Sequence, residues 1–219
     1  MTLINLPFRR HTFPIIISCL FSAVFFSKQT AKAEEPGLYH FVTGETQKEI
    51  SFSPELELER LDSLIALDNN NAEYFYNRGW LHKYLDNPKK AEKDYSRAVE
   101  IDKGHADAYY NRGLIYMETE RYDLAVKDFS EVIRIKPQAA DAFCNRGNAY
   151  LAKGKIKNAL KDFTSAINIA PQDPDLYYNR ALLYLSEGKK AKAMGDMREA
   201  ARLGHSQAKR YLETSGEKL

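Results

Sequence analysis

The sequence predicts an all-α solenoid, in which helical hairpins of one kind stack side by side. The first observation is a recurrence: the stretch Tyr76–Gly79 returns as Tyr110–Gly113 and, in altered form, as 144–147 and 178–181, each time after 34 residues. The second is that small and bulky residues recur at fixed places within each repeat. Because one hairpin leaves an apolar face uncovered, a series of such hairpins is expected to stack.

Residues 1–33 are expected to be a cleavable signal peptide, so that the protein is exported and becomes periplasmic or secreted. They hold four basic residues, no Asp or Glu, the apolar run 14–26 and a small-x-small cleavage site that ends at Ala33. The run of 13 residues is shorter than the about 20 that cross a bilayer. Lipidation at Cys19, or retention of the segment as an anchor, remains an alternative, and the chain is expected at a membrane only in these cases.

Removal of residues 1–33 lowers the count of Lys and Arg from 32 to 28 against 30 Asp and Glu, and so changes the net charge from +2 to −2. Without a basic surplus, nucleic acid is not expected as a partner. Cys144 would be the one cysteine that remains. We therefore expect packing, and no intrachain disulfide, to stabilise the exported fold.

Residues 34–52 are expected to be a linker or arm. Residues 53–71 are expected to form a half-repeat with one helix, because Ser53-Pro54 is a helix start signal and the end of the segment aligns with the end of the next repeat. Upstream, Glu45 stands where a small residue is expected, so a complete repeat is not predicted there.

Four full repeats follow, at 72–105, 106–139, 140–173 and 174–205, and residues 206–219 are expected to be a capping helix and tail. Positions 4, 8 and 11 of each repeat share one face of a first helix, and positions 20, 24 and 27 share one face of a second. Position 4 is aromatic and position 24 is bulky. The small residues at positions 8 and 20 are Gly79, Gly113, Gly147 and Ala181, and Ala91, Ala125, Ala159 and Ala193.

These small residues are expected to lie where the two helices of a hairpin cross. Antiparallel helices normally lie about 8–10 Å apart, and a missing side chain lets them approach. The large residues at positions 4 and 24 would then fill the space beside the crossing. Asn87-Pro88 and Asp173-Pro174 are expected to cap helix starts, and Gly154 and Gly188 fall at the turns between helices.

This pattern resembles the tetratricopeptide repeat family over residues 72–205, and the C-terminal stretch "AARLGHSQAKRYL" is also similar to Sel1-like repeats. The resemblance implies a right-handed α-solenoid that acts as a protein-protein interaction module, an adaptor or scaffold that binds a peptide or protein segment in its concave groove. Two departures stand out: His82 replaces a usual Tyr, and Arg occupies position 7, where Leu is common.

The resemblance places the groove residues on the first helices. They are Tyr76, Asn77, Trp80, Lys83, Tyr110, Asn111, Leu114, Met117, Cys144, Asn145, Asn148, Tyr178, Asn179 and Leu182. Tyr and Trp bring large contact area, and Asn side chains are able to bond an extended peptide backbone. The alternative is that these side chains pack between neighbouring first helices, with Asn bonded to its own helix.

Two charged patterns also recur. An Arg at position 7 is followed 16 residues later by an Asp, as in Arg112 and Asp128, and the spacing predicts that the two side chains pair. Such a pair would fix the hairpin, or the Arg would recognise a ligand carboxylate. Position 2 is acidic throughout, and forms either a rim for basic partners or favourable contacts with the helix dipole.

No catalytic residue, metal site or cofactor is expected, and the chain is predicted not to be an enzyme. The four His outside the signal peptide do not pair at metal-ligand spacing, and no glycine-rich phosphate loop is present. Two alternatives to the binding module remain. One is a structural or self-associating subunit of an envelope complex. The weaker is an enzyme or redox protein that uses Cys144, the single candidate for a reactive group.

Overall fold

The computed structural model describes residues 53–216, which form ten α-helices and, within that range, no strand. In chain order the helices are α2 (Pro54–Leu67), α3 (Ala72–Tyr84), α4 (Pro88–Ile101), α5 (Ala106–Glu118), α6 (Tyr122–Ile135), α7 (Ala140–Ala152), α8 (Ile156–Ile169), α9 (Pro174–Ser186), α10 (Lys190–Arg202) and α11 (Ser206–Thr214).

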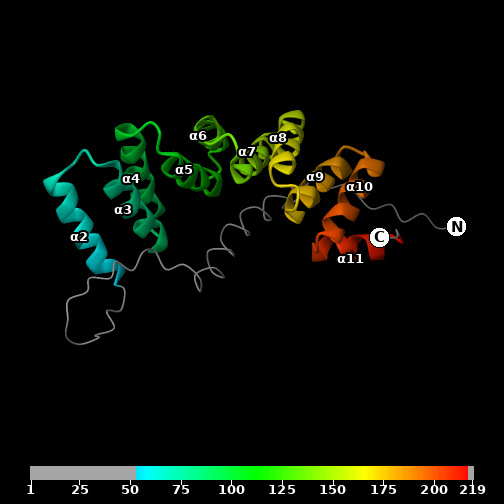
Figure 1. Ribbon diagram of the computed structural model, residues 1–219, viewed down its shortest axis with the longest axis horizontal. Coiled ribbons are helices and arrows are strands. Elements are labelled where there is room, and N and C mark those ends of the chain that lie inside the picture. Colours follow the sequence, from blue (N-terminus) through cyan, green and yellow to red (C-terminus); the bar gives the residue numbers. More distant parts are fainter. Residues whose placement is uncertain (1–52, 217–219) are drawn as a thin grey trace.

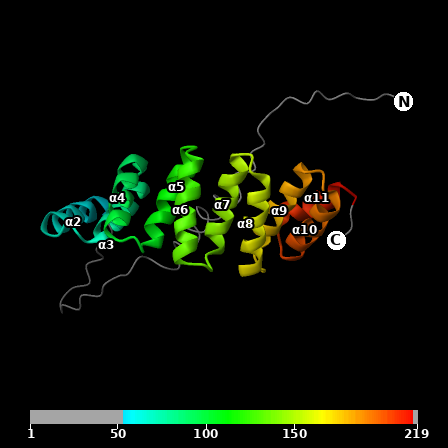
Figure 2. The same ribbon diagram turned by 90° about the horizontal axis from the view of Figure 1, so that it is seen from above.

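The helices form four successive hairpins, α3–α4, α5–α6, α7–α8 and α9–α10, and each hairpin packs on the next. Figures 1 and 2 show an arched row of helices with α2 at one end and α11 at the other. The predicted all-α solenoid is therefore confirmed. The predicted signal peptide (1–33) and arm (34–52) lie outside the described residues, and no helix within 53–216 is both long and apolar enough to cross a bilayer.

Five of the ten helix starts within residues 53–216 have a side-chain hydrogen bond that caps them, those of α2, α3, α5, α9 and α11. The side chain of Ser53 accepts a hydrogen bond from Leu56 N, and that of Asp173 accepts one from Asp175 N. Asn87, which the sequence suggested as a cap for α4, makes no such bond. Its amide instead donates to the carbonyl oxygen of Leu85 at 2.9 Å, so the prediction of a side-chain cap at Asn87 is wrong.

The turn inside each hairpin requires the left-handed backbone conformation at one residue. Gly154 and Gly188 adopt it, with φ of 69° and 71°. In the first two hairpins the equivalent residues are Asp86 and Glu120, with φ of 59° and 57°. The backbone of all four turns is thus alike, although only two of them have the residue that adopts this conformation without strain.

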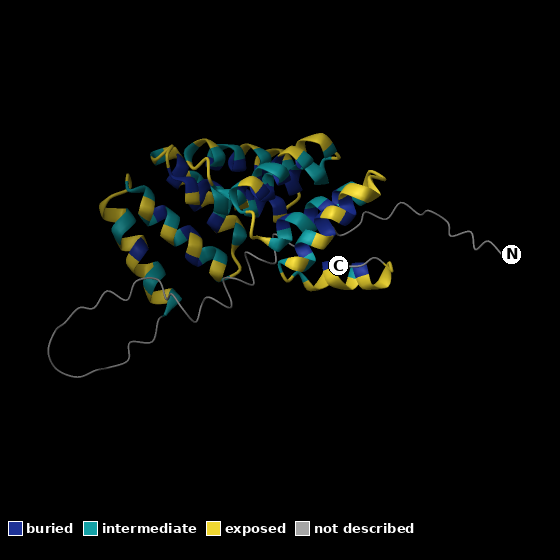
Figure 3. Ribbon diagram, turned by 45° about the vertical axis from the view of Figure 1, so that its right-hand side comes forward, coloured by how far each residue is buried: buried dark blue, intermediate teal, exposed yellow. Residues whose placement is uncertain are grey.

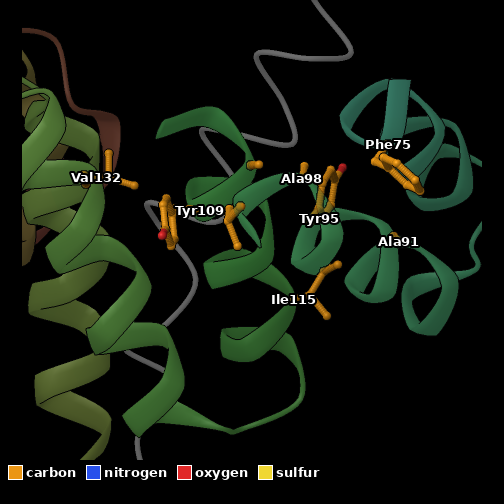
Figure 4. Packing of buried hydrophobic residues seen from close by; sticks show 10 residues of the cluster. Phe75, Ala91, Tyr95, Ala98, Tyr109, Ile115 and Val132 are labelled. Atoms are coloured by element: carbon orange, nitrogen blue, oxygen red, sulfur yellow. The ribbon is translucent and has the colours of Figure 1, made fainter. Parts of the chain in front are cut away.

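The hairpins close because an aromatic ring at position 24 lies against the glycine at position 8. A Cβ built on Gly113 would come within 2.9 Å of Phe129 Cε1, and a Cβ on Gly147 within 3.0 Å of Phe163 Cε1. Gly79 is equally close to Tyr95, whose ring lies in the buried cluster between the first two hairpins (Figure 4). The glycine therefore receives the ring of position 24 itself, in addition to easing the approach of the helices.

The fourth hairpin has different residues at the two positions that meet where its helices cross. Its position 8 is Ala181 and its position 24 is Met197, and both are fully buried. A flexible thioether side chain adjusts to an added methyl group, whereas a ring does not. The exchange of both residues together explains why Ala is tolerated in this hairpin.

The two terminal helices have polar residues at positions where the inner hairpins have small or apolar residues. In α2, Glu57 stands at the position of the buried alanines and accepts a hydrogen bond from Arg60 Nε at 2.7 Å. In α11, Lys209 and Glu213 are exposed. Figure 3 shows the exposed face that α11 presents at its end of the row. Polar outer faces on terminal helices keep a stacked array soluble.

We predict that Gly113→Ala destabilises the protein by about 1–3 kcal/mol, because the added methyl group overlaps the ring of Phe129. The double variant Gly113→Ala/Phe129→Met copies the pair found in the fourth hairpin and should recover much of that loss. Urea unfolding followed by circular dichroism measures both. Equal stability of Gly113→Ala and the wild type would contradict the proposed contact.

Candidate interaction surface

The position-7 arginines each hold three helices together. Arg112 on α5 donates from Nε and Nη2 to the two carboxylate oxygens of Asp128 on α6, both at 2.8 Å. Its Nη1 donates at 3.1 Å to Ser96 Oγ on α4, the second helix of the preceding hairpin. The Arg–Asp pairing that the spacing predicts is therefore present, and the third bond joins neighbouring hairpins.

The same arrangement occurs in every hairpin. Arg146 bonds Asp162 and Ser130, and Arg180 bonds Asp196 and Thr164. In the first hairpin, Arg78 bonds Asp94 and reaches the carboxylate of Asp62 on α2 at 2.7 Å. The hydrogen bonds that Arg146 and Arg180 donate to these aspartates raise the pKa of both arginines.

Aromatic rings enclose each guanidinium from the sides. Arg112 Cζ lies 5.6 Å from the ring centre of Tyr109 and 5.7 Å from that of Tyr116. In the first hairpin Arg78 Cζ lies 5.5 Å from the ring centre of Phe75, and His82, which stands where Tyr116 does, has a pKa lowered by burial. Because neighbouring hairpins and rings occupy these arginines, the contacts favour the structural role over recognition of a ligand carboxylate.

The position-6 asparagines also bond across hairpins. Asn145 Nδ2 donates to Tyr110 OH at 2.9 Å, and Asn111 Nδ2 donates to Tyr76 OH at 3.3 Å and to the carbonyl oxygen of Asp107 in its own helix at 3.0 Å. Burial raises the pKa of Tyr110. These contacts match the alternative interpretation, in which Asn and Tyr pack between first helices, and extend it from one helix to the next.

Five of the predicted groove residues are almost fully buried. Their exposed fractions are 1–3%, and they are Met117, Cys144, Asn145, Asn148 and Asn179. Such side chains present no surface to a partner, so their assignment as contact residues is corrected. Met117 belongs to a cluster with Tyr116 and Ala149, and Cys144 to one with Phe163 and Leu176. The burial of Cys144 also gives no support to the alternative of a reactive thiol.

Other predicted groove residues are half-buried, and two are exposed. The half-buried ones are Tyr76, Lys83, Tyr110, Asn111, Leu114, Tyr178 and Leu182, and the exposed ones are Asn77 and Trp80. Lys83 Nζ forms an ion pair with Glu118 on α5. The accessible part of the predicted groove is therefore concentrated on α3.

On α3, four residues spaced four, three and four apart form one exposed stripe: Glu73, Asn77, Trp80 and Tyr84. We call this the α3 stripe. Trp80 is 40% exposed and Tyr84 63% exposed, and their rings stack with centres 5.6 Å apart at 11°. Tyr84 was not among the predicted residues, although its spacing from Trp80 places both on one face.

Asn77 is exposed, and no residue of a preceding first helix packs against its amide within residues 53–216. Each later asparagine at position 6 faces a residue of the first helix before it, such as Tyr76 for Asn111. The helix before α3 is α2, which packs as a second helix and, within residues 53–216, has no first helix ahead of it. The same polar group that joins hairpins elsewhere is therefore left on the surface of the first hairpin.

Two histidines that the sequence did not single out cap helices at hairpin junctions. His205 Nδ1 accepts from Ala208 N at 3.1 Å, its ring stacks on Tyr178 with centres 4.1 Å apart, and its Nε2 lies 3.3 Å from Asp175 Oδ1. His105 repeats this at the start of α5, with its ring 4.7 Å from that of Tyr76 and Nε2 3.4 Å from Glu73 Oε1. Burial lowers the pKa of His205.

The position-2 acids sit in the first turns of their helices, as the dipole interpretation requires, and Asp107 also pairs with Lys136 Nζ at 2.7 Å. Glu73 is the most accessible of those that form an ion contact, with 67% of its side chain exposed. Residues 53–216 contain no group of three or more His, Cys, Asp or Glu side chains that is placed to hold a metal ion.

Family models match most of this array. A model described as "Tetratricopeptide repeat" matches residues 72–105, a second with the same description matches 174–203, and one described as "TPR repeat" matches 113–154 and 147–188. Together they cover more than half of the chain. No curated protein sequence matches the chain closely enough to count as a relative.

Several solved structures share the fold at low sequence identity. MamA from Desulfovibrio magneticus RS-1 is 17% identical, covers 87% of this chain and 97% of its own, and gives a TM-score of 0.66. YrrB, described as a protein "with an unusual peptide-binding site", is 20% identical over 73% of this chain and 84% of its own, with a TM-score of 0.66. PilF of Pseudomonas aeruginosa is 17% identical, covering 87% and 77%, with a TM-score of 0.62.

We predict that Asp128→Ala destabilises the protein by about 3–5 kcal/mol, because it leaves the enclosed Arg112 without its carboxylate. Glu131→Ala is the matched control: it removes an exposed partner of Arg134 and should cost no more than about 1 kcal/mol. Urea unfolding measures both. Similar losses in the free energy of unfolding for the two variants would show that the buried pair stabilises the protein no more than the exposed pair does.

We predict that His205 makes the protein less stable in mild acid. Since burial lowers its pKa in the folded state below the ordinary 6.5, the unfolded chain binds a proton more readily, and stability falls as the pH drops through 6.5 to the folded value. His205→Asn keeps a capping oxygen without this titration. The loss of stability between about pH 7.5 and about pH 5 should therefore be smaller in the variant, and an unchanged loss would rule out His205 as its source.

Proposed function

Because the chain belongs to the tetratricopeptide repeat family, we propose that it is a protein-interaction module, an adaptor or scaffold that binds a peptide or protein segment on the α3 stripe. The observation that carries this proposal is the exposed, stacked pair of Trp80 and Tyr84.

An exposed Trp–Tyr pair is suited to anchor a partner. Both side chains present large area at a low cost in conformational entropy, and both types are enriched among the residues that dominate binding free energies. The pair is already stacked, so little ordering remains to be done on binding. Other exposed large apolar residues within 53–216 do not form such a pair: Leu56 and Leu67 lie eleven residues apart on α2, and Leu124 lies on α6.

The polar residues of the α3 stripe suggest how an extended segment would be held. Asn77 lies one turn before Trp80, and its amide is able both to donate to and to accept from a peptide backbone. Glu73, at the start of α3, adds a negative charge that favours a basic side chain in the partner. YrrB, which has the same fold, is described as having a peptide-binding site, and this description supports the proposed class of partner.

Export is part of the same proposal. The basic start, apolar run and small-x-small site within residues 1–33 support secretion to the periplasm or the medium. The partner would then be met outside the cytoplasm. N-terminal sequencing of the protein recovered from cells tests this: a chain that still begins at Met1 would contradict cleavage after Ala33.

We predict that peptides selected from a random display library with the wild-type protein bind at least about tenfold more weakly to Trp80→Ala and to Tyr84→Ala, because each variant removes half of the stacked pair. Leu124→Ala is the matched control, since Leu124 is 41% exposed, close to the 40% of Trp80, but lies on a second helix. Fluorescence polarisation of dye-labelled peptides measures binding to the wild type and to all three variants. Wild-type affinity in both variants would remove the assignment.

A further inference from the structure

Lysines gather at the turns inside the last two hairpins. Lys153 and Lys155 lie in the α7–α8 turn, and Lys189 lies in the α9–α10 turn. Lys157 lies in the first turn of α8 and Lys161 one turn further along, and Lys190 and Lys192 lie in the first turn of α10. All except Lys153 are exposed. The hairpins follow one another in the row (Figure 2), and Lys155 and Lys189 occupy equivalent positions in them. We call these seven residues the lysine edge.

The charge of the described chain is divided between its halves. Residues 140–216 contain 13 Lys and Arg against 8 Asp and Glu, a net charge of +5, whereas residues 53–139 contain 13 against 17, a net charge of −4. Some of these lysines have partners within the fold: Lys153 pairs with Asp123, Lys189 Nζ lies 3.6 Å from Glu187, and Lys192 Nζ lies 5.7 Å from the ring centre of Tyr184. Within residues 53–216, Lys155, Lys157 and Lys161 form no ion pair.

Two of these lysines gain no stability from the helix starts that they precede. Lys155 and Lys189 immediately precede α8 and α10, and neither helix start has a side-chain hydrogen bond to cap it. A cation at a helix start opposes the helix dipole, so an acid or a small polar residue would be more favourable there. Lys155 also forms no ion pair within residues 53–216, so its charge is available to a partner.

The lysine edge has no large exposed apolar residue and no arginine, and this composition indicates the kind of partner. All large apolar residues that are exposed within 53–216 lie before residue 140, so the edge offers no anchor of the type that dominates protein interfaces. Its cations are lysines, which act as flexible point charges, and not arginines, which recognise carboxylates through a fixed fork. An anionic lipid surface attracts clustered lysines through charge alone and needs neither an apolar anchor nor a fixed fork.

We propose that the lysine edge of α7–α10 rests on the headgroups of an anionic phospholipid bilayer. This proposal is independent of the proposed function, because the α3 stripe lies in the opposite, acidic half of the chain. The two surfaces together suit an adaptor that presents a bound segment beside a membrane.

The test is sedimentation of the purified protein with vesicles of phosphatidylcholine mixed with phosphatidylglycerol, and with vesicles of phosphatidylcholine alone. We expect binding to the anionic vesicles, and release as salt is raised. Each lysine near such a surface contributes about fivefold, so Lys155→Gln/Lys157→Gln/Lys192→Gln should weaken binding about a hundredfold. Binding to phosphatidylcholine alone measures any contribution from the apolar run at 14–26.

The matched control is Lys89→Gln/Lys90→Gln/Lys93→Gln, which removes the same charge from exposed positions at the start of α4, beside Asp86 and Glu92. This variant should bind almost as the wild type does. Three results would overturn the proposal: no binding to anionic vesicles, equal losses in the two triple variants, or binding to soluble polyglutamate but not to vesicles. The last result would assign the edge to an acidic protein, and far-UV circular dichroism excludes unfolding as the cause of a loss.

Discussion

The rest of the structure depends on one contact, the guanidinium that joins three helices. Each position-7 arginine, as in Arg112, bonds an aspartate of its own hairpin and a hydroxyl or carboxylate of the hairpin before it. An arginine partly removed from water is stable only where its charge and its donors are satisfied. The contact therefore fixes two arrangements: how the two helices of one hairpin cross, and how one hairpin packs on the next. These two arrangements determine which side chains of the first helices are exposed.

Much of this architecture could be predicted from sequence because it is local or strictly periodic. The glycine at position 8 and the ring at position 24 recur in one hairpin after another, and the Arg–Asp spacing of 16 residues follows from the hairpin alone. The cross-hairpin contacts could not be predicted, because they depend on how one hairpin rotates against the next. The sequence therefore predicts Asn145 as a groove residue, although its side chain bonds Tyr110. For the same reason it does not predict Ser96 as a partner of Arg112.

The α3 stripe, by contrast, lies where the periodic pattern of the hairpins is interrupted. In the inner hairpins the Asn and Tyr side chains of the first helices are used to hold neighbours, and five predicted contact residues are buried as a result. The first hairpin lacks a described first helix before it, so Asn77 remains accessible beside Trp80. The lysine edge, by contrast, partly follows the repeat, because Arg121 stands at the same place before α6. What distinguishes the last two hairpins is the number of lysines that gather there.

The arginine contact also bears on how an array of this kind grows. Residues 106–139 supply the Arg and Asp that close their own hairpin, and Ser130, the hydroxyl that the next arginine needs. A duplicated copy of such a segment would arrive with both sides of the joint already encoded. Lengthening by gene duplication then requires no compensating change in the neighbours, whereas Glu57 and Lys209 place polar side chains on the two terminal helices of the described array.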